Sequence, residues 1–127
     1  MLTVPTALLL HRTTDGSHHD WLVGMPDYRQ DPTTRLWAAR VAPASRHWRG
    51  LGRFDLSVIA PHRRAYLEYQ GAVSDGRGSV MRIDRGTAVI LLWSSMRIVW
   101  EVRMRDFTGT IEAQKRAGNN WGATVVL

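Results

Sequence analysis

Short apolar or alternating segments separated by Gly, Pro, Asp and Asn dominate this chain, and no long window keeps a helical period. Residues 54–59 are typical, because Phe, Leu and Val alternate there with Asp and Ser, as in a half-buried strand. With 127 residues, the chain is expected to form a single domain, residues 1–127, with a core of ordinary size. About eight short strands joined by tight turns predict an all-β fold, a compact closed or nearly closed β-barrel of mostly antiparallel strands.

The same pattern predicts individual elements. Residues 7–11 and 18–23 are expected to pair as a hairpin, because the segment between them carries the turn signal Asp15-Gly16. Residues 87–93, 98–104 and 108–112 read as a meander, and Asp84-Arg85-Gly86 before them reads as a turn. The remaining expectations are strands at 36–41, 54–59, 79–83 and 121–127, an exposed loop at 25–34, a linker at 43–52, and a short strand or turn at 63–69.

Composition narrows the classes of function. The chain has no cysteine, which excludes disulfide scaffolds, thiolate zinc sites and cysteine nucleophiles. Its net charge is +6, and Lys115 is the only lysine, so guanidinium groups carry nearly all the positive charge. This charge favours an acidic partner such as nucleic acid, whereas the preference for Arg over Lys is also what a GC-rich genome produces. The apolar run at residues 6–10 is too short to span a membrane, so a cytoplasmic protein is expected.

Two histidines and an aspartate mark a candidate metal site. On a strand, His18 and Asp20 project from one face, and a tight turn at Asp15-Gly16 brings His11 opposite His18. Two imidazoles and a carboxylate form a ligand set suited to Mn²⁺, Zn²⁺ or Fe²⁺ that leaves coordination positions open. The alternative is that these histidines are simply solvated beside a hairpin turn.

A second cluster surrounds His62 at the exit of a predicted strand. His62, Arg63, Arg64 and Tyr66 lie within five residues and suit a phosphate, with imidazolium as proton donor and guanidinium as charge clamp. The alternative is a basic surface turn with Tyr66 packed beneath it.

Six tryptophans are expected in the core or at its rim rather than as stacking platforms for bases. Trp48 is the exception, because Arg46 and Arg49 flank it, and we expect it to be exposed. The tryptophans are Trp21, Trp37, Trp48, Trp93, Trp100 and Trp121.

An ordered set of short motifs extends from about Leu8 to Trp121. In chain order the motifs are His11, His18-His19-Asp20, Leu36-Trp37-Ala38, His62-Arg63-Arg64-Ala65-Tyr66, Tyr69-Gln70-Gly71, Gly76-Arg77-Gly78, Asp84-Arg85-Gly86-Thr87, Phe107-Thr108-Gly109 and Asn119-Asn120-Trp121. The set resembles the 3'-phosphoesterase domain of bacterial DNA ligase D. The resemblance implies a compact β-barrel that binds Mn²⁺, or another divalent metal such as Zn²⁺. It further implies a role in DNA repair, the removal of a terminal phosphate or ribonucleotide from nucleic-acid 3' ends.

The resemblance also implies roles for individual residues. His18 and Asp20 match metal ligands of the family, and His11 matches the third. His62 and Tyr66 match the pair that contacts the scissile phosphate. With these roles, the metal polarises a phosphate oxygen while His62 offsets the charge that develops in the transition state.

Two phosphate-binding arginines of the family have no counterpart in this chain. Their positions fall at Leu22 and Phe54. The arginines expected to replace them are Arg53, Arg63, Arg64 and Arg77.

Two functions of different classes follow. The first is a stand-alone, divergent phosphoesterase whose partners are DNA or RNA-terminated DNA 3' ends and, in repair, a separate DNA ligase or polymerase. The alternative is a catalytically inactive module of the same fold that binds nucleic-acid ends or a repair partner. A barrel holding a small ligand in its interior is a third possibility that no particular residue supports.

Overall fold

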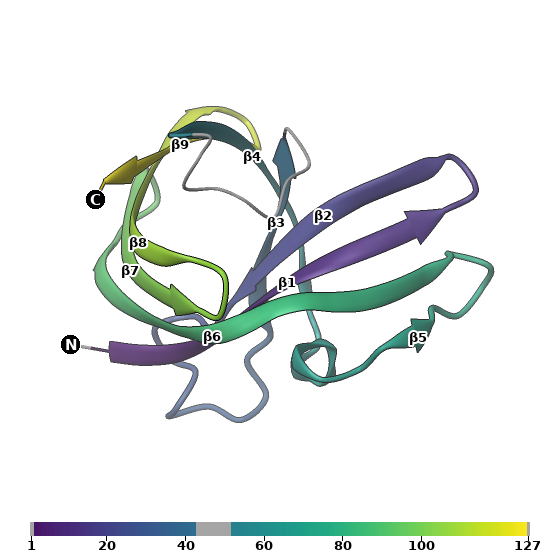
Figure 1. Ribbon diagram of the computed structural model, residues 1–127. Helices are drawn as coiled ribbons and strands as arrows, with labels where there is room; N and C mark the ends of the chain where they lie inside the picture. The colour runs from purple at the N-terminus through teal and green to yellow at the C-terminus, as the bar shows by residue number, and fades with distance from the viewer. Residues whose placement is uncertain (1, 43–51, 127) are drawn as a thin grey trace.

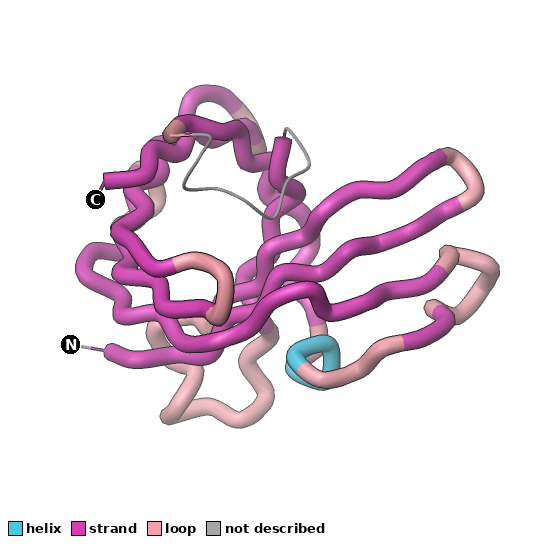
Figure 2. Tube along the Cα trace, in the orientation of Figure 1, coloured by secondary structure: helices cyan, strands magenta, loops and turns pink. Residues whose placement is uncertain are grey.

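The computed structural model describes residues 2–42 and 52–126, which form one nine-stranded antiparallel sheet (Figure 1). The only helix among the described residues is a single 3₁₀ turn, η1 (Arg64–Leu67), where a short strand or turn was expected (Figure 2). The strands are β1 (Leu2–Thr13), β2 (Gly16–Val23), β3 (Leu36–Ala42), β4 (Arg53–His62), β5 (Gly71–Ala72), β6 (Ser79–Trp93), β7 (Arg97–Met104), β8 (Thr108–Ala117) and β9 (Asn120–Val126).

Eight of these strands form a ring. They follow one another in the order β1, β2, β3, β4, β9, β8, β7 and β6, and β6 pairs back with β1. This arrangement confirms the predicted all-β fold with a nearly closed ring of antiparallel strands. On one side β1, β2 and β6 extend beyond the ring, and β5 lies there beside the start of β6 (Figure 1).

The local predictions near the hairpin and the meander are confirmed. β1 and β2 form the expected hairpin, in which His11 is the partner of His18, and β6, β7 and β8 follow one another as a meander. No strand or helix occurs at residues 25–34, as expected for a loop. The expected linker, apart from Gly52, lies outside the described residues, and so does Trp48.

The predicted turn at Asp84-Arg85-Gly86 is wrong, because β6 runs through these residues without interruption. Gly86 does not form a turn but allows β6 and β7 to pack closely together. A Cβ atom at Gly86 would lie 1.8 Å from the carbonyl oxygen of Arg103 on β7, a distance that no side chain tolerates. The Asp84 side chain is buried inside the structure, where a turn residue would be solvated.

The strand expected at residues 54–59 ends later than predicted, since β4 continues through Pro61 to His62. The pairing of β4 with β9 ends at Ser57, followed by one hydrogen bond from the Val58 N–H to the Asn119 carbonyl oxygen. At Pro61, no strand in the described part of the chain pairs with this edge. A proline is tolerated on such a free edge because its missing N–H breaks no ladder bond. The extension brings His62 opposite Leu36 at the start of β3.

Asp84 ties the β7–β8 turn to β6. Its Oδ1 accepts the backbone N–H groups of Arg85 and Arg105 at 2.8 and 2.9 Å, and its Oδ2 accepts that of Asp106 at 3.0 Å. We expect Asp84→Ala to lower the free energy of unfolding by about 2 to 4 kcal/mol, because three amides lose their acceptor. Urea unfolding followed by tryptophan fluorescence measures the loss.

Asp55→Ala is the matched control for this experiment. Asp55 accepts one hydrogen bond from Arg116 at 2.8 Å, and both side chains are exposed. Such surface pairs contribute about 0 to 1 kcal/mol, so the two substitutions should differ clearly. Equal stabilities of the two variants would contradict the anchoring role of Asp84.

Apolar side chains form two clusters on opposite faces of the sheet. The larger cluster fills the ring and contains Trp21, Trp37, Trp100 and Trp121, which are buried as expected. The smaller one, which we call the outer cluster, consists of Ala7, Leu9, Leu22, Leu36 and Ala38 on the outer face of β1, β2 and β3. Tyr28, Ile59, Tyr66 and Leu67 pack over it, so η1 covers the outer face of the sheet.

Candidate metal and phosphate site

His11, His18 and Asp20 come together on the outer face of the β1–β2 hairpin. His11 is the cross-strand partner of His18, and Asp20 is the partner of Leu9, two residues before His11. Because side chains two apart on a strand share a face, all three project from the side that also carries the outer cluster. The turn at Thr14-Asp15, which Gly16 follows as the first residue of β2, and the two-residue alternation thus produce this grouping locally.

The three side chains present their ligand atoms at distances suited to one cation. His11 Nδ1 lies 3.1 Å from His18 Nε2, His18 Nε2 lies 3.3 Å from Asp20 Oδ2, and His11 Nδ1 lies 3.9 Å from Asp20 Oδ2. The point equidistant from these atoms is about 2.0 Å from each, which matches zinc–nitrogen and zinc–oxygen bonds. The spacing of the three atoms is therefore suited to a divalent metal ion, which would take the place of Arg40 on His18 Nε2.

A hydrogen bond to the backbone leaves the lone pair of the His11 imidazole available to a ligand, whereas the corresponding nitrogen of His18 accepts a hydrogen bond from Arg40. His11 Nε2 lies 2.7 Å from the carbonyl oxygen of Arg77, to which it donates, and its Nδ1 is then the lone-pair atom of the neutral ring. Arg40 donates from Nη2 to His18 Nε2 at 3.2 Å. Burial lowers the pKa of His18, an effect that Asp20 opposes and that Arg40 and His11 reinforce. Neutral imidazole is the form that binds metals.

Asp20 has an unsatisfied oxygen, which is a second sign of a cation site. The residue is 3% exposed, and its Oδ1 has no hydrogen-bond partner among the described residues. The nearest cationic atom to this oxygen is Arg40 Nε at 3.9 Å, beyond hydrogen-bond distance. Buried carboxylates are normally paired or bound to metal, so a cation that contacts both oxygens of Asp20, rather than Oδ2 alone, would remove this deficit.

His62 lines a hollow of about 280 Å³ together with His11 and Asp20. Its Nδ1 is 2.9 Å from the carbonyl oxygen of Ala60, to which it donates, so Nε2 is the nitrogen that remains for a ligand. The rings of His62 and Tyr66 meet edge to face at 5.7 Å. The polar residues that line the hollow are His11, Asp20, Arg35, His62, Arg63, Tyr66, Ser74 and Arg77.

Of the four arginines predicted to bind phosphate, two line this hollow and two lie elsewhere. Arg63 and Arg77 line it. Arg64 instead donates to the carbonyl oxygens of Tyr28, Asp31 and Thr34, which fixes the loop between β2 and β3. Arg53 lines a different hollow, formed by residues of β4, β8 and β9.

Arg35 and Arg40 belong to the site, although neither was among the predicted site residues. Arg35 lines the hollow because it directly precedes Leu36, the partner of His62. Arg40 is the cross-strand partner of Asp20. The only sequence signal for either residue was its closeness to the Leu36-Trp37-Ala38 motif, which does not reveal the strand pairing.

Two positions that carry arginine in the resembling family are occupied here by core residues. Leu22 is fully buried in the outer cluster, and Phe54 is 4% exposed in the ring core. Neither a leucine nor a phenylalanine side chain can donate a hydrogen bond to an anion. Arg35, Arg63 and Arg77 are the arginines that line it, and the Arg77 guanidinium also donates to the carbonyl and hydroxyl oxygens of Ser74.

Within the described residues no helix has the length and apolar character needed to cross a lipid bilayer. Comparison of the chain with protein-family models and with curated protein sequences gives no significant match.

Proposed function

We propose that this protein is a divalent-metal-dependent phosphoesterase that removes a phosphate or ribonucleotide from nucleic-acid 3' ends. The observation that carries the proposal is that His11 and Asp20, two of the three candidate metal ligands, line one hollow with His62 and three arginines. A phosphate monoester is the ligand class that suits this combination of cation, imidazole and guanidinium groups. The preference for 3' ends comes from the resemblance to the 3'-phosphoesterase domain of DNA ligase D.

The arginines hold and orient the phosphate. Arg35, Arg63 and Arg77 border the hollow, and guanidinium groups form forked, charge-assisted hydrogen bonds to phosphate oxygens. Asp20 also lines the hollow, and a cation bound to it would offset its negative charge toward the phosphate.

His62 is the residue placed to move a proton. Its Nδ1–H is fixed on the Ala60 carbonyl, so its Nε2 in the protonated ring donates toward the hollow. Donation there would stabilise charge on a phosphate oxygen or on the leaving group. Tyr66 packs against the imidazole and restricts its rotation.

A divalent ion held by His11, His18 and Asp20 would supply Lewis-acid stabilisation of the phosphate charge. Both Mn²⁺ and Zn²⁺ accept two imidazoles and one carboxylate.

Release of inorganic phosphate from a 3'-phosphorylated oligonucleotide tests the proposal directly. We expect release in Mn²⁺ and none after treatment with a chelator. The same oligonucleotide phosphorylated at its 5' end is the control and should remain intact. Failure to release phosphate in Mn²⁺, Zn²⁺, Fe²⁺ and Co²⁺ would rule out the proposed activity.

The replacement of family arginines by Leu22 and Phe54 favours a second candidate, a non-catalytic module for nucleic-acid ends or a repair partner such as a ligase or polymerase. Such a module would bind DNA in chelator as well as in Mn²⁺, and its affinity would fall steeply with salt because phosphate contacts release counterions. Loss of DNA binding on chelation would exclude this candidate.

A further inference from the structure

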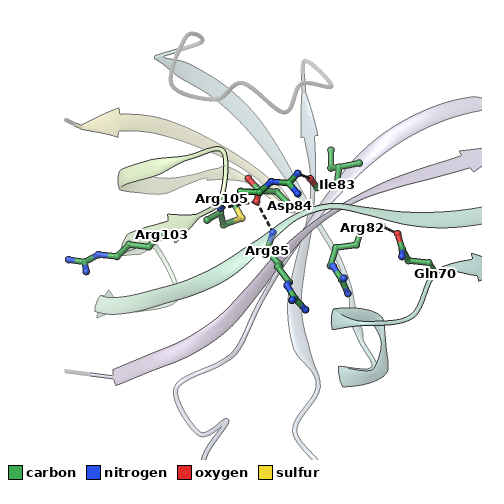
Figure 3. Close-up of a pocket in the computed structure, with 8 residues that line it drawn as sticks. Gln70, Arg82, Ile83, Asp84, Arg85, Arg103 and Arg105 are labelled. Atoms are coloured by element: carbon green, nitrogen blue, oxygen red, sulfur yellow. Dashed lines mark hydrogen bonds between the residues drawn. The ribbon is translucent and has the colours of Figure 1, made fainter.

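A second hollow lies along β6 and the end of β7, and four arginines line it (Figure 3). Its volume is about 510 Å³. Arg82 and Arg85 come from β6, Arg103 from β7, and Arg105 from the turn after β7, and Gln70 faces Arg82 from the segment after η1.

A β-bulge places Arg82 and Arg85 on one face of the sheet. Along β6, residues three apart normally project from opposite faces. The pairing with β1 shifts here, since Leu8 is the partner of Asp84 and Leu9 that of Arg82, which leaves Ile83 as an extra residue. Both arginines consequently extend to the same side of β6, as Figure 3 shows. That side is the outer face, because Arg82 is the partner of Leu9 in the outer cluster.

The hollow carries an excess of positive charge. Among the residues that the structure describes, no carboxylate forms an ion pair with Arg82 or Arg85. Arg103 is paired with Glu101 at 2.7 Å. Asp84 is the one carboxylate in the lining, and its oxygens are already bound by three backbone N–H groups.

The arginine-lined hollow continues the phosphate site on the same face. Val80, the partner of His11, lines the first hollow, and Arg82 follows two residues later on the same side of β6. The helix η1 lies between the two hollows: Tyr66 lines the first, and the Leu67 carbonyl accepts a hydrogen bond from Arg82 Nη1 at 3.0 Å. Measured along the partner strand β1, which has no bulge, Arg82 and Arg85 are about 7 and 14 Å from Val80.

We propose that Arg82 and Arg85 bind backbone phosphates of a nucleic-acid strand whose 3' end lies in the first hollow. The ligand in this inference, a nucleic-acid strand, rests on the proposed function. The inference adds the course that this strand takes across η1. For a strand stacked as in a duplex, with about 3.4 Å per nucleotide along its axis, the two arginines reach phosphates about two and four nucleotides from the end. The side-chain oxygen of Gln70 accepts the backbone N–H of Arg82 at 3.1 Å. The side-chain NH₂ group of Gln70 is therefore the part that can donate to the same path.

Binding of fluorescent single strands of two to ten nucleotides with 3'-hydroxyl ends tests the inference without turnover. For the wild-type protein we expect affinity to rise with length up to about five nucleotides and then level off. Arg85→Gln should weaken binding of the longer strands and leave the dinucleotide unchanged. It should also reduce the slope of log affinity against log salt by about 0.7, the value for one phosphate contact on a single strand.

Two further variants separate charge from structure. Arg85→Lys keeps the charge and should keep the salt slope. Arg97→Gln removes an exposed arginine at the start of β7, about 20 Å along the strand from Arg103, and should leave both affinity and slope unchanged. Arg82→Gln should repeat the effect of Arg85→Gln.

The possible outcomes distinguish this inference from the proposed function. If Arg85→Gln and Arg82→Gln match wild type in affinity and slope, the inference is overturned, whatever the phosphatase assay gives. Strand binding that does not depend on length overturns it as well. If no phosphate is released but both variants lower the slope, the strand path stands and the phosphoesterase proposal fails.

Discussion

His18→Ala is expected to abolish both metal binding and phosphate release. His18 Nε2 lies within 3.3 Å of both other candidate ligand atoms, so its removal leaves a cation with only two protein ligands. The charge stabilisation that a metal provides amounts to several kcal/mol, so turnover should fall at least about a hundredfold. Calorimetric titration with Mn²⁺ and the phosphate-release assay measure the two effects separately.

His19→Ala is the matched control, because it removes the same side chain at the adjacent position, which faces the other side of β2. This variant should bind Mn²⁺ like wild type. A third variant, His62→Ala, should bind the metal normally. Its rate of phosphate release should be lower by a factor of about 10² to 10⁴, the usual contribution of a proton-transfer group. If His18→Ala retained full metal affinity, the grouping of His11, His18 and Asp20 would not be a metal site.

Trp100→Ala is expected to cause the largest loss of stability of any substitution considered. Trp100 is fully buried at the centre of the ring, with its ring centroid 4.6 Å from that of Trp21 and 5.2 Å from that of Trp37. Replacing a buried tryptophan by alanine costs about 3 to 5 kcal/mol, because packing is lost and a cavity remains. A domain of this size has a total stability of about 5 to 15 kcal/mol, so urea unfolding should show a large shift in midpoint.

Trp100→Phe separates packing from polarity at the same position. The Trp100 Nε1 is buried and has no hydrogen-bond partner among the described residues. An unpaired buried donor costs about 1 to 3 kcal/mol, so phenylalanine loses part of the ring contact but also removes this penalty. We therefore expect Trp100→Phe to be much less destabilising than Trp100→Ala. Similar losses for both variants would mean that the indole donor is satisfied in solution.

The β1–β2 hairpin shows how far local rules extend. Alternation along a strand and the turn signal Asp15-Gly16 are enough to bring His11, His18 and Asp20 to one face, and the structure has them there. The same local rules predict the order of β6, β7 and β8 and the burial of most tryptophans.

The segment around Gly86 shows where those rules fail. In isolation Asp84-Arg85-Gly86 has the composition of a turn, yet β6 passes through it because strands lie on both sides. The side chain of Asp84 satisfies amides that are distant in sequence, and Gly86 makes room for the backbone of β7. Neither requirement is visible until the neighbouring strands are known.

The sequence by itself therefore determined the all-β class and the candidate metal ligands, since both depend on side-chain alternation and turns between adjacent residues. Only the tertiary structure decided which arginines border the hollow, including Arg35 and excluding Arg53. It also decided that a bulge at Ile83 turns Arg82 and Arg85 to the same face. The reason is physical: strand register and bulges are set by pairing between segments far apart in the chain, which no local pattern encodes.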